Sequence, residues 1–234
     1  MTPIFEIAGL TGGYGEIDIL KGIDLHVAPG EIVTIAGTNG AGKSTIIKAA
    51  MGLLPRVAGS VRFEAHDITR ERVETRLKAG IGYVPQVANV FASLSVHDNL
   101  LVVQGVRDAR RRAEAMYEMF PALAAHRRRR AGSLSGGERQ QLAFARALMR
   151  TPRMMLLDEP TAALSPALVD EIFSYVARLP AAGTAVLMVE QRARQSLAVS
   201  QRGYIIDQGT IAMQGDAASL LTDPAAADLF IGRH

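Results

Sequence analysis

The sequence predicts an α/β fold built on a mostly parallel β-sheet, and three observations support this prediction. Short apolar segments typical of strands alternate with segments in which apolar residues recur at helical spacing. A glycine-rich turn separates the apolar strand Glu31–Ala36 from the helix that follows it. The stretch from about Val87 to Arg150 has helical spacing, and we expect it to form a helical insertion in the sheet.

The expected elements follow from apolar patterning, glycine turns and prolines. An N-terminal region of short strands is interrupted by a turn at Gly12–Gly15, and Pro55 and Pro180 each end a helix. Ser165 and Pro166 are the N-cap and first residue of the second of these helices. The remaining predictions are strands and helices at Ile4–Leu25, Glu31–Ala36, Ser44–Leu54, Val57–Phe63, Ala79–Pro85, Met154–Leu157, Ser165–Pro180 and Ala185–Val189, with a hairpin formed by Tyr204–Asp207 and Gly209–Met213.

Composition excludes several classes of protein. The 234 residues are 48% apolar, which is enough for a sizeable core. The absence of cysteine excludes disulfides, thiolate-bound metals and thiol nucleophiles. No apolar run approaches the roughly 20 residues of a membrane-spanning helix, and the N-terminus does not read as a signal peptide, so we expect a cytoplasmic location. The net charge of +3 is compatible with phosphate, nucleic acid or a membrane surface as partner.

The segment Gly37–Ser44 fits the P-loop pattern G-x-x-x-x-G-K-[ST]. Its glycines allow backbone N–H groups to surround phosphate oxygens, Lys43 offers a positive charge, and Ser44 offers a hydroxyl to Mg²⁺. The helix that follows adds its positive N-terminal end. We therefore expect nucleotide binding by Gly37, Asn39, Gly40, Ala41, Gly42, Lys43, Ser44 and Thr45.

Two carboxylates, Asp158 and Glu159, end the apolar strand Met154–Leu157 and precede Pro160. A carboxylate at the end of a parallel strand is well placed to hold Mg²⁺ opposite a P-loop, and Asp158 suits that role. Glu159 could polarise a water molecule for attack on the γ-phosphate. Taken alone, the same residues are also compatible with an ordinary polar turn.

The string Leu134–Glu138 precedes a further helix. Ser135 and Glu138 have the spacing of a capping box, which needs no functional explanation. Gly136 and Gly137 each cost about 1 kcal/mol relative to alanine in a helix, so we expect a group to approach the backbone there. A second phosphate on this helix N-terminus is the candidate.

Together these three motifs resemble those of the ATP-binding cassette (ABC) ATPases, and the resemblance covers essentially the whole chain. It implies a P-loop NTPase core with an N-terminal antiparallel β subdomain and an inserted α-helical subdomain. Residues 1–234 would form one domain, with 1–86 and 151–234 as the core and 87–150 as the helical subdomain. It also implies a head-to-tail dimer in which Ser135, Gly136 and Gly137 of one subunit close over ATP, with its Mg²⁺, on the P-loop of the other.

The same resemblance assigns three further residues. Tyr14 matches the aromatic residue that stacks on adenine, and Gln86 matches the glutamine that contacts Mg²⁺ and senses the γ-phosphate. Gln191 stands where most members have a histidine, so its amide can bond the γ-phosphate but cannot carry a positive charge or shuttle a proton. Ser165 also departs from the pattern, because many relatives have aspartate there.

Val189–Gln191 and the ending Leu220–Pro224 resemble the F-type ATP-binding subunit of branched-chain amino acid importers. This resemblance implies a paralogous or identical partner subunit, two transmembrane permeases, an extracytoplasmic solute-binding protein acting indirectly, and a peripheral location at the cytoplasmic face of the membrane. Pro85–Val87 departs from the Pro-Glu-Gly of many such subunits, which leaves the solute open.

Two alternative functions remain. One is an ABC ATPase that acts on nucleic acid or the ribosome, and the other is a subunit that binds ATP with little turnover. The excess of basic residues lies within residues 107–130, which contain eight arginines and three carboxylates. Arg127–Arg130 is either a solvated helix end or a contact with the membrane complex or its anionic lipids, and nucleic acid is the least expected partner.

Overall fold

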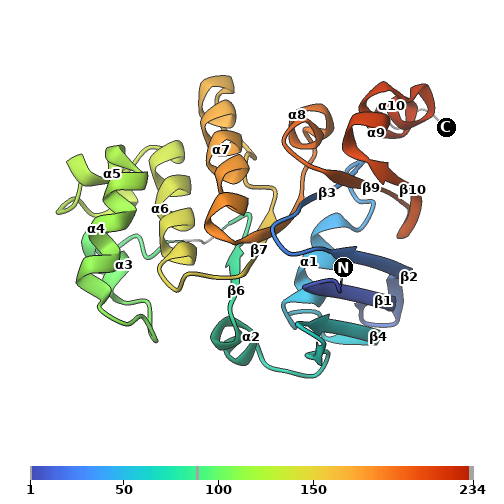
Figure 1. The fold of residues 1–234 in the computed structure, drawn as a ribbon, viewed down its shortest axis with the longest axis horizontal. Helices are drawn as coiled ribbons and strands as arrows, with labels where there is room; N and C mark the ends of the chain where they lie inside the picture. The colour runs from blue at the N-terminus through green and yellow to red at the C-terminus, as the bar shows by residue number, and fades with distance from the viewer. Residues whose placement is uncertain (1, 88–89, 232–234) are drawn as a thin grey trace.

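The computed structural model describes residues 2–87 and 90–231, which form two sheets and the helices that cover them (Figure 1). The strands are β1 (Phe5–Tyr14), β2 (Ile17–Val27), β3 (Ile32–Gly37), β4 (Arg56–Phe63), β5 (His66–Asp67), β6 (Ile81–Val84), β7 (Met154–Asp158), β8 (Ala185–Val189), β9 (Arg202–Asp207) and β10 (Thr210–Asp216). The α-helices are α1 (Lys43–Ala50), α2 (Val73–Ala79), α3 (Val96–Leu101), α4 (Ala109–Met119), α5 (Pro121–Ala125), α6 (Gly136–Leu148), α7 (Pro166–Arg178), α8 (Ala193–Ala198), α9 (Ala217–Thr222) and α10 (Pro224–Ile231).

The larger sheet has six strands in the order β10-β9-β3-β8-β7-β6. All neighbours are parallel except β9 and β10, which form the predicted antiparallel hairpin. The smaller sheet has the order β2-β1-β4-β5 and is antiparallel throughout. The predicted fold, a mostly parallel sheet with an N-terminal antiparallel sheet and a helical insertion, is confirmed.

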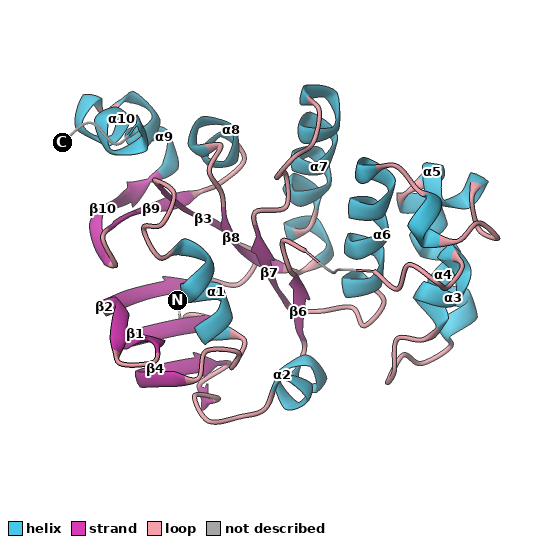
Figure 2. Cartoon of the chain, turned by 180° about the vertical axis from the view of Figure 1, so that it is seen from behind, coloured by secondary structure: helices cyan, strands magenta, loops and turns pink. Residues whose placement is uncertain are grey.

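Alternate residues of the central parallel strands contribute to two separate cores, because successive side chains of a strand point to opposite faces. Leu156 and Leu187 belong to the core shared with α1 and the smaller sheet. Leu157 and Met188 belong to the core shared with α6 and α7. Seen from behind in Figure 2, α3–α6 stand at one end of the molecule and the smaller sheet lies toward the other.

Several predicted boundaries are wrong. The N-terminal strand continues through Gly12 and Gly13, and the turn lies after Tyr14. A side chain at either glycine would collide with a neighbouring strand's backbone, so these glycines permit close strand approach instead of forming the turn. Helix α1 ends at Ala50 and not at Leu54, because Gly52 has a positive φ of 71° that terminates it before Pro55.

Two further predictions need correction. Ala79 ends α2, which the sequence analysis did not predict, and β6 begins only at Ile81 because Gly80 has a φ of 113°. Ser165 is the N-cap residue of α7, but its side chain makes no capping hydrogen bond. Helices α8, α9 and α10 were also not predicted. Within the described parts of the chain, no helix has the length and apolarity that crossing a membrane requires.

Candidate functional site

The P-loop connects the buried strand β3 to α1, as its pattern predicts. Lys43 is only 4% exposed, and its Nζ donates hydrogen bonds of 2.9 Å to the carbonyl oxygens of both Gly37 and Thr38. Burial lowers the pKa of Lys43, while the nearby carboxylates of Glu159, Glu190 and Asp158 oppose that shift. The lysine is thus held at the loop and surrounded by negative charge.

The P-loop meets the end of β7 through a direct side-chain contact. Ser44 donates a hydrogen bond of 2.6 Å from Oγ to Oδ1 of Asp158. Burial raises the pKa of Asp158, and the Ser44 hydrogen bond and the charges of Lys48 and Lys43 act in the opposite direction. The two residues predicted to share a cation are therefore adjacent, although they are far apart in the sequence.

Glu159 occupies an unusual backbone position directly after Asp158. Its φ is +46°, a conformation that non-glycine residues rarely adopt, and its N–H donates to the carbonyl of Val189 on the neighbouring strand. Its Oε2 accepts a hydrogen bond of 2.7 Å from Nε2 of Gln86. The backbone and Gln86 together direct this carboxylate toward the cleft.

An open cleft of about 810 Å³ lies beside these groups. It brings Gln86, Glu159 and Gln191 together with the P-loop residues Asn39 and Gly40. The predicted catalytic residues therefore come from three separate loops and share one cavity. The full lining is Asn39, Gly40, Gln86, Glu159, Thr161, Ala162, Ala163, Glu190, Gln191 and Arg192.

Sequence reasoning gave no role to Glu190, which is 1% exposed. Its Oε1 accepts hydrogen bonds from the backbone N–H and the hydroxyl of Thr161, at 2.9 and 2.8 Å, and its Oε2 accepts one from the N–H of Gln191. Burial raises its pKa despite these bonds. Glu190 thus connects the loop after Glu159 to the loop that carries Gln191. In the sequence, the signal that could have indicated this role is the position of Glu190 directly before Gln191.

Tyr14 is not among the residues that line this cleft. It lies at the end of β1 with 44% of its surface exposed, and Nζ of Lys48 on α1 is 5.9 Å from the centre of its ring. The neighbouring Ile17, its cross-strand partner, is also exposed. The Tyr14 ring is therefore partly exposed beside the P-loop helix, and its stacking on adenine stays a prediction.

The Leu134–Glu138 string forms the N-terminus of α6, and the predicted capping box is present. A side chain at Gly137 would come within 2.5 Å of Leu168 on α7, whereas one at Gly136 would meet only Leu164 at 3.9 Å. We expected a group to approach the backbone closely at these glycines, and at Gly137 that group is Leu168 on α7 of the same chain. Ser135 and Gly136 are exposed, and phosphate binding there stays a prediction.

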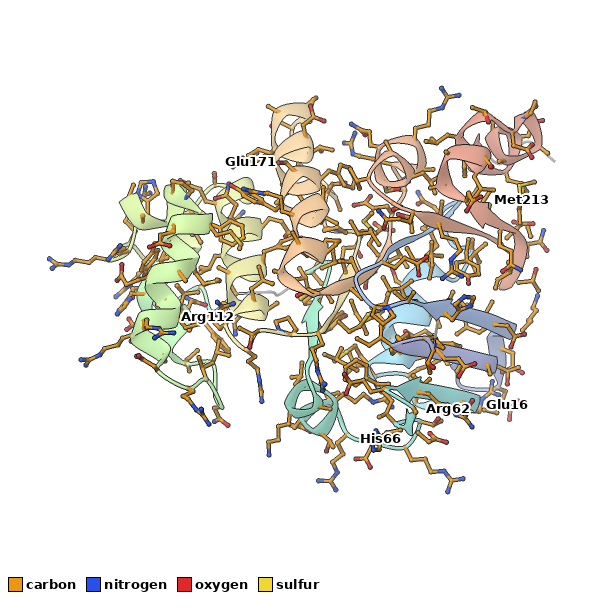
Figure 3. The ribbon with its side chains drawn as sticks, viewed as in Figure 1. Glu16, Arg62, His66, Arg112, Glu171 and Met213 are labelled. Carbon is orange, nitrogen blue, oxygen red and sulfur yellow. The ribbon has the colours of Figure 1, made fainter. Side chains whose placement is uncertain are left out.

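Helix α6 is also fastened to α7 by polar groups. Nε2 of Gln141 on α6 donates to Oε1 of Glu171 on α7 at 3.0 Å, and the hydroxyl of Tyr175, also on α7, donates to the same oxygen at 2.7 Å. Glu171 is labelled on α7 in Figure 3. In Figures 1 and 2, α6 and the P-loop helix α1 lie on opposite sides of β7, and Ser135, Gly136 and Gly137 are not among the residues that line the cleft.

Curated relatives align with nearly the full chain. It is 37% identical to the high-affinity branched-chain amino acid transport ATP-binding protein BraG of Pseudomonas aeruginosa, over 94% of this chain and 95% of BraG. It is 39% identical to the probable branched-chain amino acid transport ATP-binding protein LivF of Archaeoglobus fulgidus, over 95% and 96%. Identity to the lipopolysaccharide export system ATP-binding protein LptB of Escherichia coli is 37%, over 92% and 91%.

Solved structures agree with this grouping. The ADP conformation of MJ1267, an ATP-binding cassette of an ABC transporter, superposes with a TM-score of 0.86 at 29% identity, covering 99% of this chain and all of MJ1267. The ATP-binding cassette MJ0796, solved as a dimer in a post-hydrolysis state bound to ADP and phosphate, gives a TM-score of 0.81 at 25% identity, covering 91% and 98%. Residues 20–162 match the ABC transporter family. The chain therefore belongs to the ABC transporter family and is an ATP-binding, ATP-hydrolysing subunit of such a transporter.

Proposed function

We propose that the cleft hydrolyses ATP to drive the import of branched-chain amino acids or related small solutes. The observation that carries the hydrolytic part is the pair of hydrogen bonds Ser44–Asp158 and Gln86–Glu159 beside the P-loop. On ATP binding, Lys43 exchanges its two loop carbonyls for phosphate oxygens, and residues 37–45 surround the β- and γ-phosphates. Tyr14 stacks on the adenine from the edge of the smaller sheet.

Glu159 acts as the general base in this proposal. Its carboxylate takes a proton from a water molecule as the water oxygen attacks the γ-phosphorus and the bond to the β-phosphate oxygen breaks. Gln86 holds that carboxylate in place, and the amide of Gln191 donates to the γ-phosphate from the opposite loop. Because the Gln191 amide cannot carry charge, Lys43 is the residue of this proposed site that supplies positive charge to the γ-phosphoryl oxygens.

The residues at Ser44 suit Mg²⁺. A hydroxyl, the Asp158 carboxylate and the Gln86 amide offer hard oxygen ligands, and Mg²⁺ typically uses one or two carboxylates together with phosphates and water. When bound, Mg²⁺ neutralises charge on the phosphate oxygens.

A second subunit completes the site in our proposal, because Ser135, Gly136 and Gly137 lie outside the chain's own cleft. The exposed N-terminus of α6 is suited to an anion, and the dimeric structure of MJ0796 supports a dimer as the working state. The partner is a paralogous subunit or a second copy of this chain. ATP would then lie between the P-loop of one subunit and the α6 N-terminus of the other.

A second cavity supports a permease contact. A groove of about 710 Å³ runs between α2, β6, α6 and the loop that follows α3, and it includes apolar Leu77, Pro85 and Ala147 with cationic Lys78 and Arg150. Val87 and Phe91, close to its Pro85 end in sequence, are exposed apolar residues. We place a cytoplasmic helix of a transmembrane permease in this groove, which would hold the chain at the inner face of the membrane.

The solute assignment depends on the relatives BraG and LivF, and similarity to LptB makes lipopolysaccharide export the second candidate. Affinity purification of the tagged chain with its membrane partners distinguishes the two. Import predicts a co-purifying extracytoplasmic binding protein that binds leucine, isoleucine or valine. Recovery of bound lipopolysaccharide would support export, and recovery of ribosomes or RNA would support the nucleic-acid alternative.

The hydrolytic proposal is tested by Glu159→Gln, which removes the base but keeps the side-chain size. Gel filtration with ATP and Mg²⁺ should show a stable dimer for this variant, because bound ATP is no longer consumed. Glu118→Gln, an exposed change on α4, is the matched control and should behave like the wild type. A Glu159→Gln variant that elutes only as a monomer would contradict the sandwich dimer or the role of Glu159.

A further inference from the structure

Arg76 is a buried cation that forms no salt bridge with a carboxylate of the described residues, although the charges of Glu71 and Asp67 act on it. It lies on α2 and is 1% exposed. Among the described residues, the guanidinium donates its hydrogen bonds to backbone carbonyls. Nε donates to Glu71 at 3.0 Å, Nη2 to Thr69 at 2.9 Å, and Nη1 to both Ala49 and Ala50. Burial lowers its pKa to about 10, so the cation is maintained at neutral pH.

The two carbonyls bound by Nη1 belong to the last residues of α1. Carbonyls at a helix C-terminus carry partial negative charge, so a buried cation is favourable there, and the Ala49 carbonyl accepts from Arg76 in addition to the N–H of Gly52. Arg76 thus caps the helix that begins with the P-loop residues Lys43 and Ser44. The same guanidinium also holds the segment that leads into α2, through Thr69 and Glu71.

Gly52 provides the space for this contact. A side chain there would come within 2.9 Å of Nη2 of Arg76 and 3.0 Å of its Cζ. Gly52 also has the positive φ that ends α1. The end of the P-loop helix is therefore shaped around the arginine, which is a second and independent observation that the two form one unit.

The other side of α2 faces the groove. Glu74, Leu77 and Lys78 form part of the groove wall, whereas Arg76 is directed into the interior. One short helix consequently contacts both the end of the P-loop helix and the proposed permease surface. A displacement of α1 as phosphate binds at its N-terminus would be passed to α2 through a rigid, planar set of hydrogen bonds.

We propose that Arg76 is a positioning residue that couples nucleotide binding at the P-loop to the position of α2 at the groove. This inference rests on the proposed function for the meaning of the groove. The contact of Arg76 with the C-terminal end of α1 would be a second route, in addition to the contact between Gln86 and Glu159 at the cleft. The planar fork matters as much as the charge, because a lysine ammonium cannot reach carbonyls on α1 and before α2 in the same fixed geometry.

Amide hydrogen exchange of the full chain, with and without a non-hydrolysable ATP analogue and Mg²⁺, tests the coupling. In the wild type the analogue should slow exchange both in the P-loop and in α2, by about fivefold or more in α2. Arg76→Lys should keep the slowing in the P-loop and lose it in α2. Arg72→Lys, at an exposed arginine that precedes the same helix, is the matched control and should retain both effects.

A purely structural role for Arg76 would raise exchange in α2 equally with and without the analogue, so only the analogue-dependent difference reports coupling. If Arg76→Lys fails to fold, Gly52→Ala is the second variant. Its methyl group crowds the guanidinium without removing it, and the positive φ of Gly52 adds strain at the end of α1. It should likewise keep the slowing in the P-loop and lose it in α2. Retention of the α2 effect in Arg76→Lys or in Gly52→Ala would overturn the inference. If the analogue left the wild-type P-loop unprotected, the proposed nucleotide site itself would be contradicted.

Discussion

Glu190 shows how a single buried carboxylate organises the catalytic loops. It accepts two hydrogen bonds from Thr161 and one from the N–H of Gln191, so it connects the loop after β7 to the loop after β8. Burial raises the pKa of Glu190 above the ordinary 4.5, and the nearby charge of Glu159 acts in the same direction. The ionised form is therefore disfavoured in the folded protein relative to the unfolded chain.

This pKa shift predicts a pH dependence of stability. Because the folded pKa is higher than the unfolded one, the folded state binds the additional proton, and the contribution of Glu190 to the free energy of unfolding falls as pH rises from 4.5 through the folded pKa. Glu190→Gln removes that fall while keeping an oxygen acceptor for Thr161. Its free energy of unfolding relative to the wild type should therefore increase with pH.

Urea unfolding between about pH 4.5 and 7.5 measures this difference. Glu118→Gln, at an exposed position on α4, controls for the loss of one carboxylate. Parallel pH profiles for the wild type and Glu190→Gln would show that Glu190 titrates alike in the folded and unfolded states, contrary to this prediction.

At the scale of elements, the start of α6 combines a phosphate-binding prediction with a packing requirement. Gly136 has room for a methyl group, and Gly137 is covered by Leu168 of α7. Alanine in a helix is ordinarily more stable than glycine by up to about 1 kcal/mol. Gly136→Ala should therefore raise the free energy of unfolding, and Gly137→Ala should give no gain or a loss, because Leu168 must move.

A double-mutant cycle separates these effects. In the Leu168→Ala background, Gly137→Ala should recover the stabilisation seen for Gly136→Ala, as measured by urea unfolding. An equal effect of Gly137→Ala with and without Leu168 would mean that α7 does not limit this position. The comparison concerns stability only, so it is independent of any phosphate bound at α6.

The elements also show where sequence reasoning succeeded. Strand β8 and the β9–β10 hairpin were predicted because their apolar patterns are local and bounded by turn residues. The end of α1 was mispredicted because it depends on Gly52 and on Arg76, which is 24 residues further along the chain. The roles of Glu190 and Leu168 were also missed, since each follows from a contact between separate elements and leaves no periodic signal.

At the scale of the whole molecule, some arginines of residues 107–130 make contacts within the helical region. Arg127 forms a bidentate pair with Glu114 and lies over the ring of Tyr117, and Arg112 donates to the carbonyl of Leu148 at the end of α6. Arg128 is exposed. Part of the basic excess therefore holds the helical region together, and the contact with anionic lipids stays a prediction.

Among the residues that the structure describes, none lines both the cleft and the groove. If the groove holds a permease helix, blocking it should abolish assembly and leave nucleotide binding intact. Ala147 lies on α6 in the groove wall, and Ala115 is a comparably half-buried alanine on α4 outside it. Ala147→Glu introduces a long charged side chain into the groove, whereas Ala115→Glu places the same group elsewhere on the helical region.

Ala147→Glu should lose at least about 90% of the co-purifying permease, because a contact worth 1.4 kcal/mol or more changes binding tenfold. Ala115→Glu should recover the permease at the wild-type level. Both variants should bind a fluorescent ATP analogue at the cleft with the same affinity as the wild type, which would show that each is folded. Wild-type recovery of permease with Ala147→Glu would move the docking surface away from the groove. Loss of permease with both variants would instead indicate that the whole helical region, and not this groove alone, forms the contact.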